Sequence, residues 1–158
     1  MKTVYCDSNF WLRLFVNFEE SDTARLEFYK LREEKEVRLP LTWLQRMEVT
    51  NGFNLLAFQT RSGHFPRVTI EQAILAFENF RELAAGDSFA LNQPLEITEL
   101  EARFVTLSER HTSKHGFRTY DVLNVSAALL IGCDTFLSFD RKATKLAALE
   151  GLKVLKLP

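Results

Sequence analysis

Residues 121–140, DVLNVSAALLIGCDTFLSFD, carry the pattern that decides the fold. The first half is apolar on almost every side, which predicts a buried helix over residues 120–131. Gly132 is typical of the residue that ends such a helix. Residues 135–139 then predict a buried strand, and Asp140 is suited to cap a following helix. A buried helix that leads into a short apolar strand and a second helix indicates a parallel sheet covered by helices.

The same alternation of strands and helices extends over the rest of the chain. Thr/Gln or Thr/Glu pairs three residues apart at Thr42, Thr69 and Thr98 form capping boxes, each of which predicts a helix start. Further strands are predicted at residues 3–6, 37–41 and 152–157, with residues 89–97 irregular or a short strand. The sequence therefore predicts an α/β fold: a three-layer α/β/α sandwich with a central, mainly parallel sheet, in one domain over residues 1–158. A further helix is expected to follow Asp7, and another to follow Asp140 and end near residue 149. The other expected helices run over residues 21–36, from 42 onward, over 69–83 and over 98–110. A polar loop is expected at 111–118.

The composition favours a packed globule over a disordered chain. Of 158 residues, 46% are hydrophobic, and the formal net charge is −1 with a sequence pI of about 6.3. Bulk charge therefore neither indicates nor excludes nucleic-acid binding. Cys6 and Cys133 lie in apolar surroundings and are expected to be buried free thiols. A strand that begins at once after Met1 leaves no room for a signal peptide, and no apolar run reaches membrane-spanning length, so a cytoplasmic protein is expected.

Four acidic residues stand where predicted strands or helices begin or end. Asp7 and Asp140 each follow a strand directly, Glu48 lies near the second turn of a helix, and Asp121 lies at a helix start. Ligands of parallel sheets gather outside the carboxyl ends of the strands, so these acids are expected to meet at one edge. Each acid taken alone also fits the role of a helix cap or surface residue. The hypothesis of a shared site depends on the four together.

Clustered carboxylates favour a site for hard divalent cations. Mg²⁺ and Mn²⁺ prefer oxygen ligands, and two such ions can activate water and stabilise the leaving oxygen in a displacement at phosphorus. Such chemistry needs no Ser/His/Asp or Cys/His arrangement, and the sequence offers none that is convincing. Metal-dependent phosphodiester hydrolysis is therefore the leading hypothesis.

These residues resemble the PIN-domain ribonucleases, in particular the VapC-like toxins of bacterial and archaeal toxin–antitoxin pairs. The resemblance covers nearly the whole chain. It is carried by VYCDSN at residues 4–9, MEVTN at 47–51, DVLNVSAAL at 121–129, GCD at 132–134, LSFD at 137–140 and GLKVL at 151–155. Asn124 departs from the family, in which this variable position is often His.

The resemblance implies a function and a set of site residues. Family members cleave RNA by metal-activated water, and VapC-like members are commonly homodimers that an antitoxin protein silences. Asp7, Glu48, Asp121 and Asp140 fall on the acidic quartet that holds Mg²⁺ or Mn²⁺, with Glu48 on the same ion or a second one. Ser138 falls on a Thr/Ser position beside the last acid, and Ser8 and Asn9 fall on a polar pair that orients the first acid.

Basic residues precede Asp121 in the segment predicted as a loop. They can form a rim that positions RNA phosphates, or simply a solvated surface. The candidates for RNA binding are Arg110, Lys114, His115 and Arg118, with His111 between them.

Two alternatives to a PIN-type nuclease remain. A PIN fold can bind RNA or a protein partner without useful catalysis. A phosphatase-like enzyme with a nucleophilic Asp after the first strand would require a second acid two residues further on, where this chain has Asn9.

Overall fold

The central sheet is entirely parallel. The computed structural model describes residues 1–64, 67–86, 89–155 and 157, and within them five strands form one sheet in the order β3-β2-β1-β4-β5. All four neighbouring pairs are parallel, which confirms the predicted sheet. The strands are β1 (Lys2–Cys6), β2 (Val37–Leu41), β3 (Ala90–Asn92), β4 (Thr135–Leu137) and β5 (Lys153–Val154).

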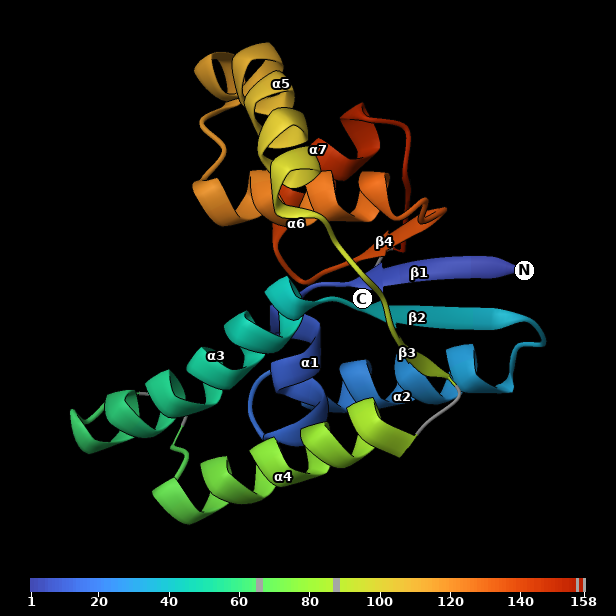
Figure 1. The fold of residues 1–158 in the computed structure, drawn as a ribbon. Helices are drawn as coiled ribbons and strands as arrows, with labels where there is room; N and C mark the ends of the chain where they lie inside the picture. The colour runs from blue at the N-terminus through green and yellow to red at the C-terminus, as the bar shows by residue number, and fades with distance from the viewer. Residues whose placement is uncertain (65–66, 87–88, 156, 158) are drawn as a thin grey trace.

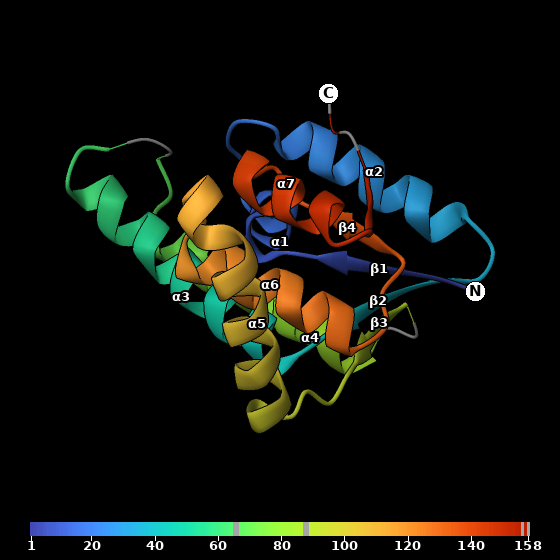
Figure 2. The same ribbon diagram turned by 90° about the horizontal axis from the view of Figure 1, so that it is seen from above.

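Helices cover both faces of the sheet, so the predicted three-layer arrangement is confirmed. In Figure 1 the helices α5, α6 and α7 gather toward β4, and α1, α2 and α4 toward β2 and β3. The residues of the two cores assign α1–α4 to one face of the sheet and α5–α7 to the other, and Figure 2 shows α5 and α6 side by side when seen from above. The helices are α1 (Ser8–Phe15), α2 (Ser21–Glu33), α3 (Trp43–Arg61), α4 (Ile70–Gly86), α5 (Ile97–His115), α6 (Thr119–Leu130) and α7 (Arg141–Leu149).

Two apolar cores lie against the sheet. Alternate side chains of β1 enter different cores: Val4 and Cys6 pack among residues of α1–α4, whereas Tyr5 packs with residues of α5, α6 and α7. All three are fully buried. Burial of both strand faces explains why the strands read as continuous apolar runs.

The sheet order places a ligand crevice at a specific edge. From the central β1 the chain goes to β2 and β3 on one side, then crosses to β4 and β5 on the other. The strand order reverses between β1 and β4, and ligands of such sheets bind outside the carboxyl ends at this point. Asp7 and Asp140 follow those two strand ends, and the backbone N–H of Asp7 donates to the carbonyl of Leu137 at 3.1 Å.

The predicted bounds of α5 and the predicted loop after it are wrong. The helix begins at Ile97 rather than at a Thr98 cap, and it continues through the polar stretch to His115. Buried Leu100 and Leu107 hold one stripe of the helix against the second core, so the polar residues between and after them form its solvated face. Gly116, with φ of 66°, ends the helix in the left-handed conformation that glycine adopts without strain.

The start of α6 also differs from the prediction. Arg118, not Thr119, is the N-cap residue, and Thr119 is the first helical residue. The carboxylate of Asp121 accepts a hydrogen bond from the backbone N–H of Arg118 at 2.8 Å, so Asp121 supplies the capping group from inside the first turn.

Two smaller expectations concern thiols and membranes. Cys6 and Cys133 are free and buried, as predicted. Among the helices of the described residues, none is long and apolar enough to cross a membrane. The predicted strand over 152–157 is shorter as β5, and residue 156 lies outside the described residues.

Candidate active site

Asp7 is a buried carboxylate held by three donors. It is the N-cap residue of α1, and its Oδ1 accepts from the backbone N–H of Phe10 at 3.2 Å. Its Oδ2 accepts from the side-chain amide of Asn9 at 2.9 Å and from the hydroxyl of Ser138. Only 5% of Asp7 is exposed, so these donors replace the water that the carboxylate has lost.

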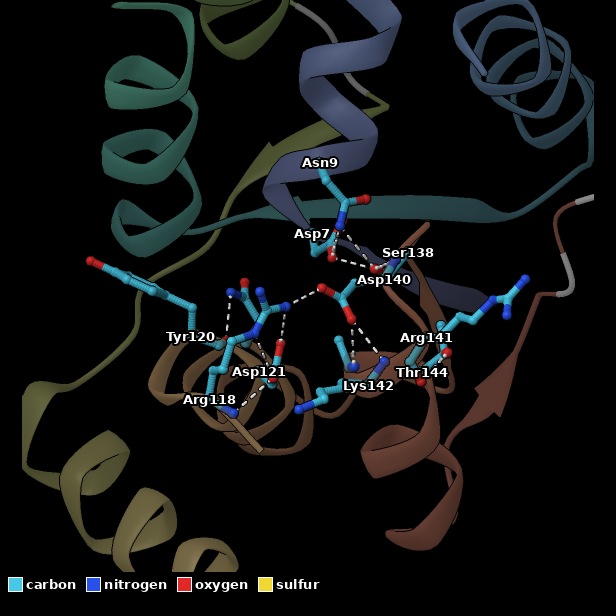
Figure 3. A network of polar contacts seen from close by, with 12 residues as sticks. Asp7, Asn9, Arg118, Tyr120, Asp121, Ser138, Asp140, Arg141, Lys142 and Thr144 are labelled. Atoms are coloured by element: carbon cyan, nitrogen blue, oxygen red, sulfur yellow. Dashed lines mark hydrogen bonds and ion pairs between the residues drawn. The ribbon is translucent and has the colours of Figure 1, made fainter. Parts of the chain in front are cut away.

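Ser138 and Asn9 connect Asp7 to the start of α7. The Ser138 hydroxyl accepts from the backbone N–H of Asp140 at 2.8 Å, and the Asn9 side-chain carbonyl accepts from the N–H of Phe139 at 3.0 Å. Asp140 in turn caps α7, since its Oδ1 accepts from the N–H of Lys142 at 2.7 Å. Of the three polar residues predicted to support the site, Asn9 and Ser138 therefore join the ends of β1 and β4 (Figure 3), whereas Ser8, also among the described residues, makes no hydrogen bond to Asp7.

Glu48 is held in place by a series of hydrogen-bonded side chains that the sequence analysis did not predict. The side-chain amide of Asn124 donates to both Glu48 carboxylate oxygens, at 3.1 and 3.0 Å, and to the carbonyl of Tyr120 at 3.0 Å. The carbonyl oxygen of Asn124 accepts from the Tyr5 hydroxyl at 2.8 Å. Ser8 also lines the cavity with Glu48 and lowers the pKa of its carboxyl. A tyrosine inside an apolar strand was the one available signal, because a buried phenol needs a partner.

The four predicted acids line one cavity of about 550 Å³. Asp7 and Asp140 reach it from strand ends, Glu48 from α3 and Asp121 from the first turn of α6. Helix N-termini favour negative charge, which lowers the cost of bringing three of these acids together at caps and first turns. The acids share the cavity with Ser8, Asn9, Asn124, Arg118 and an apolar wall of Leu12, Leu44, Met47, Leu55 and Tyr120.

Two of the acids have strongly raised pKa values. Burial raises the pKa of Asp7 from 3.8 to about 7 against the lowering effect of Ser138 and Phe10, and the charges of Glu48 and Asp140 raise it further. Burial likewise raises the pKa of Glu48 from 4.5 to about 7, despite the lowering effects of Asn124 and Ser8. Both carboxylates are therefore costly to ionise without a cation.

The donor set fits a hard divalent cation in its chemistry, whereas the present spacing of the described residues holds no three ligands around one point. Carboxylate oxygens are the ligands that Mg²⁺ and Mn²⁺ prefer, and the acids at this cavity lack compensating positive charge apart from Arg118. In the described part of the chain, no group of three or more His, Cys, Asp or Glu side chains is gathered closely enough to hold one ion. The guanidinium of Arg118 instead stands between Asp121 and Asp140.

The raised pKa of Glu48 leads to a stability prediction. Because the folded protein binds this proton more tightly than the unfolded chain does, the contribution of Glu48 to the free energy of unfolding is greatest below pH 4.5. That contribution is lost as the pH rises from 4.5 to about 7. Glu48→Gln should therefore raise the free energy of unfolding at pH 8 by on the order of 1–2 kcal/mol and leave it unchanged at pH 4.5. Thermal unfolding in EDTA at both pH values measures this effect, with Glu82→Gln at an exposed site of α4 as the control. A variant no more stable than the parent at pH 8 would contradict it.

The other predicted RNA-binding residues lie outside the cavity lining. Arg110 and His111 both bind Glu150, through distances of 2.8 and 2.6 Å, and so tie α5 to the end of α7. Lys114 and His115 lie in the last turn of α5. Of the four predicted basic residues, only Arg118 reaches the acids.

Comparison with known proteins identifies the fold. The sequence matches no protein-family model and no curated protein sequence. The structure matches VapC20 of Mycobacterium tuberculosis, described as a Sarcin-Ricin loop cleaving toxin, with a TM-score of 0.62 and 17% identity over 98% of this chain and 99% of that one. It matches a chain of VapBC2 from Rickettsia felis, bound to a DNA fragment from their promoter, with a TM-score of 0.64 and 13% identity over 99% of both chains. It also matches FitAcB from Neisseria gonorrhoeae, with a TM-score of 0.61 and 14% identity over 97% of this chain and 96% of that one. At these identities the likeness establishes the fold, and the chain therefore has the PIN-domain fold that these structures share.

Proposed function

We propose that this protein is a metal-dependent endoribonuclease and the toxin of a toxin–antitoxin pair. One observation carries the proposal: four carboxylates from separate elements line one cavity at the carboxyl edge of a PIN-type sheet. RNA as substrate is supported by the likeness to VapC20, which is described as cleaving the Sarcin-Ricin loop.

The proposed metal ligands are Asp7, Asp121 and Asp140 for the main ion, with Glu48 on the same ion or a second one. When bound, Mg²⁺ or Mn²⁺ would supply the Lewis acid that activates water and offsets charge on the leaving oxygen. Ser138 and Asn9 fix the direction of the Asp7 carboxylate, and Asn124 fixes that of Glu48. Partners of this kind typically contribute 10–100-fold in metal affinity or activity, since they hold ligands in register.

The chain's own charges and apolar surface would position the RNA. Arg118 faces the cavity, and we assign Arg110, Lys114 and His115 to a more distant rim that attracts phosphates. Leu12, Met47 and Leu55 form an apolar wall on one side of the cavity, against which RNA bases could pack.

The proposal includes an antitoxin protein as partner and a homodimer as the assembled form. The antitoxin is supported by matched chains from toxin–antitoxin structures. Large apolar side chains on α3 and α4 stay about half exposed, as an interface would require. They are Leu55, Phe58, Ile70, Ile74 and Leu75.

Metal binding by the acids is testable without RNA. Mn²⁺ is expected to raise the melting temperature of the parent protein more than that of Asp7→Asn, because the ion relieves repulsion among buried carboxylates and the variant lacks one ligand. Thermal unfolding over a Mn²⁺ titration measures the difference, with Asp22→Asn on the exposed start of α2 as control. Equal shifts in the parent and Asp7→Asn would count against a shared site.

A catalytically weak RNA- or protein-binding module is the second candidate. The ion pairs of Arg118 with Asp121 and Asp140 favour it, since they occupy two of the four acids. RNA binding that persists while cleavage is absent in the parent protein would identify such a module.

A further inference from the structure

The guanidinium of Arg118 occupies the space between two of the proposed metal ligands. Its Nη2 lies 3.3 Å from Asp121 Oδ1, and its Nε lies 3.4 Å from Asp121 Oδ2. The same Nη2 donates to Asp140 Oδ2. Figure 3 shows the guanidinium between the two carboxylates, at the centre of the polar network. One cation thus bridges the first turn of α6 and the N-cap of α7.

The two carboxylates, Asp121 and Asp140, are costly to keep ionised without a cation beside them. Asp121 is 5% exposed, and its Oδ2 is already used to cap α6 through the backbone N–H of Arg118. Asp140 uses Oδ1 to cap α7 and directs Oδ2 to the guanidinium. Among the residues that line the cavity, Arg118 alone carries a positive charge. The nearby Lys142 ammonium instead donates to the carbonyl of Gly116 at 2.8 Å.

The backbone of Arg118 is fixed, whereas its side chain can move. The backbone N–H binds Asp121, and the carbonyl accepts from Val122 at 3.2 Å, both within the start of α6. The side chain is 64% exposed, so water can solvate the guanidinium once it leaves the acids. A long flexible side chain on a fixed backbone can exchange the two carboxylates for another anion at little conformational cost.

We propose that Arg118 is an internal counter-ion that competes with the divalent cation for Asp121 and Asp140. Entry of the metal displaces the guanidinium, which then faces the cavity mouth and binds a phosphate of the RNA. The inference rests on the proposed nuclease function, because it assumes that these acids bind the ion. It predicts an enzyme that binds metal more tightly when RNA is present, since RNA phosphate holds Arg118 away from the acids.

Removal of the charge should therefore tighten metal binding. Isothermal titration of the full chain with MnCl₂, without RNA, is expected to give about three- to tenfold higher affinity for Arg118→Gln than for the parent, as displacing a partly exposed ion pair implies. The Mn²⁺ affinity of Arg118→Lys should lie between those of the parent and Arg118→Gln. Lysine keeps the positive charge but lacks the planar guanidinium that can bind two carboxylates at once. Arg25→Gln is the matched control, since Arg25 also pairs with an aspartate three residues away but lies on α2, away from the cavity.

The same variants separate metal competition from a purely structural role. At saturating Mn²⁺, Arg118→Gln is expected to raise KM for RNA more than it lowers kcat, and Arg118→Lys should restore part of the loss. Affinity for Mn²⁺ that is unchanged or lower in Arg118→Gln overturns the inference and leaves the proposed nuclease intact. Absence of Mn²⁺ binding in the parent and in every variant overturns both.

Discussion

Asn124→Ala is expected to lower RNA cleavage about 10- to 100-fold, although Asn124 is not among the proposed metal ligands. Its amide binds both oxygens of Glu48, so its loss frees the carboxylate to turn away from the cavity. The Tyr5 hydroxyl loses its acceptor in the core at the same time, which should cost about 1–3 kcal/mol of stability. Cleavage rates and thermal unfolding of the purified variant measure the two effects.

Asn54→Ala is the matched control for this prediction. Like Asn124, Asn54 donates to the carbonyl four residues earlier in its helix, but it is exposed and binds no acid. Tyr5→Phe separates the two roles further, because it removes the hydroxyl and leaves Asn124 in contact with Glu48. A folded Asn124→Ala protein that cleaves as fast as the Asn54→Ala control would show that Glu48 needs no such support.

Local sequence signals were sufficient for most of the sheet and for the placement of the acids. The bounds of β2 at Val37–Leu41 agree with the prediction, since an apolar run meets a complete capping box at Thr42 and Gln45. Asp140 caps α7 as predicted, because an acid directly after a strand has the free N–H groups of the next helix within reach. Parallel strand ends share one edge, and this geometry brings Asp7 and Asp140 to the cavity that Glu48 and Asp121 reach from α3 and α6.

The length of α5 could not be read from the sequence in the same way. Residues 111–115 are polar, which is typical of a loop, yet they continue the helix to His115. An exposed helical turn carries no apolar period, and contacts such as His111 with Glu150, 39 residues away, hold it in place. The N-cap of α6 was misplaced for a related reason, since the capping group comes from Asp121 and not from the cap residue itself.

The contacts that tune the site were also hidden from sequence reasoning. Tyr5 and Asn124 are 119 residues apart, and Asn124 and Glu48 are 76 apart, so no local pattern joins them. The sequence predicts Arg118 only as part of a basic rim, because its ion pairs with Asp121 and Asp140 depend on the packing of α6 beside α7. The direction in which a side chain points at the cavity depends on tertiary packing. The spacing of residues along the sequence does not reveal it.

The double variant Asp7→Asn/Asp121→Asn is expected to lose RNA cleavage by at least about a thousand-fold, because it removes two proposed metal ligands at once. The fold should survive. Asparagine at position 7 can still accept from Phe10, and asparagine at position 121 can still cap α6 through Arg118. Removal of a buried charge at position 7, where the carboxyl has a pKa of about 7, offsets the loss of an acceptor for Asn9 and Ser138. Thermal unfolding of the variant measures the balance, so that a difference in activity between folded proteins reports the site and not the stability.

The most direct test of a metallonuclease is cleavage of a mixed pool of labelled RNAs in Mn²⁺ or Mg²⁺ by the parent protein and by this double variant, purified identically. Cleavage by the parent alone, and its loss on addition of EDTA, is the expected result. Equal cleavage by both proteins, or cleavage that EDTA does not stop, would contradict the assignment of Asp7 and Asp121 to a metal-dependent active site.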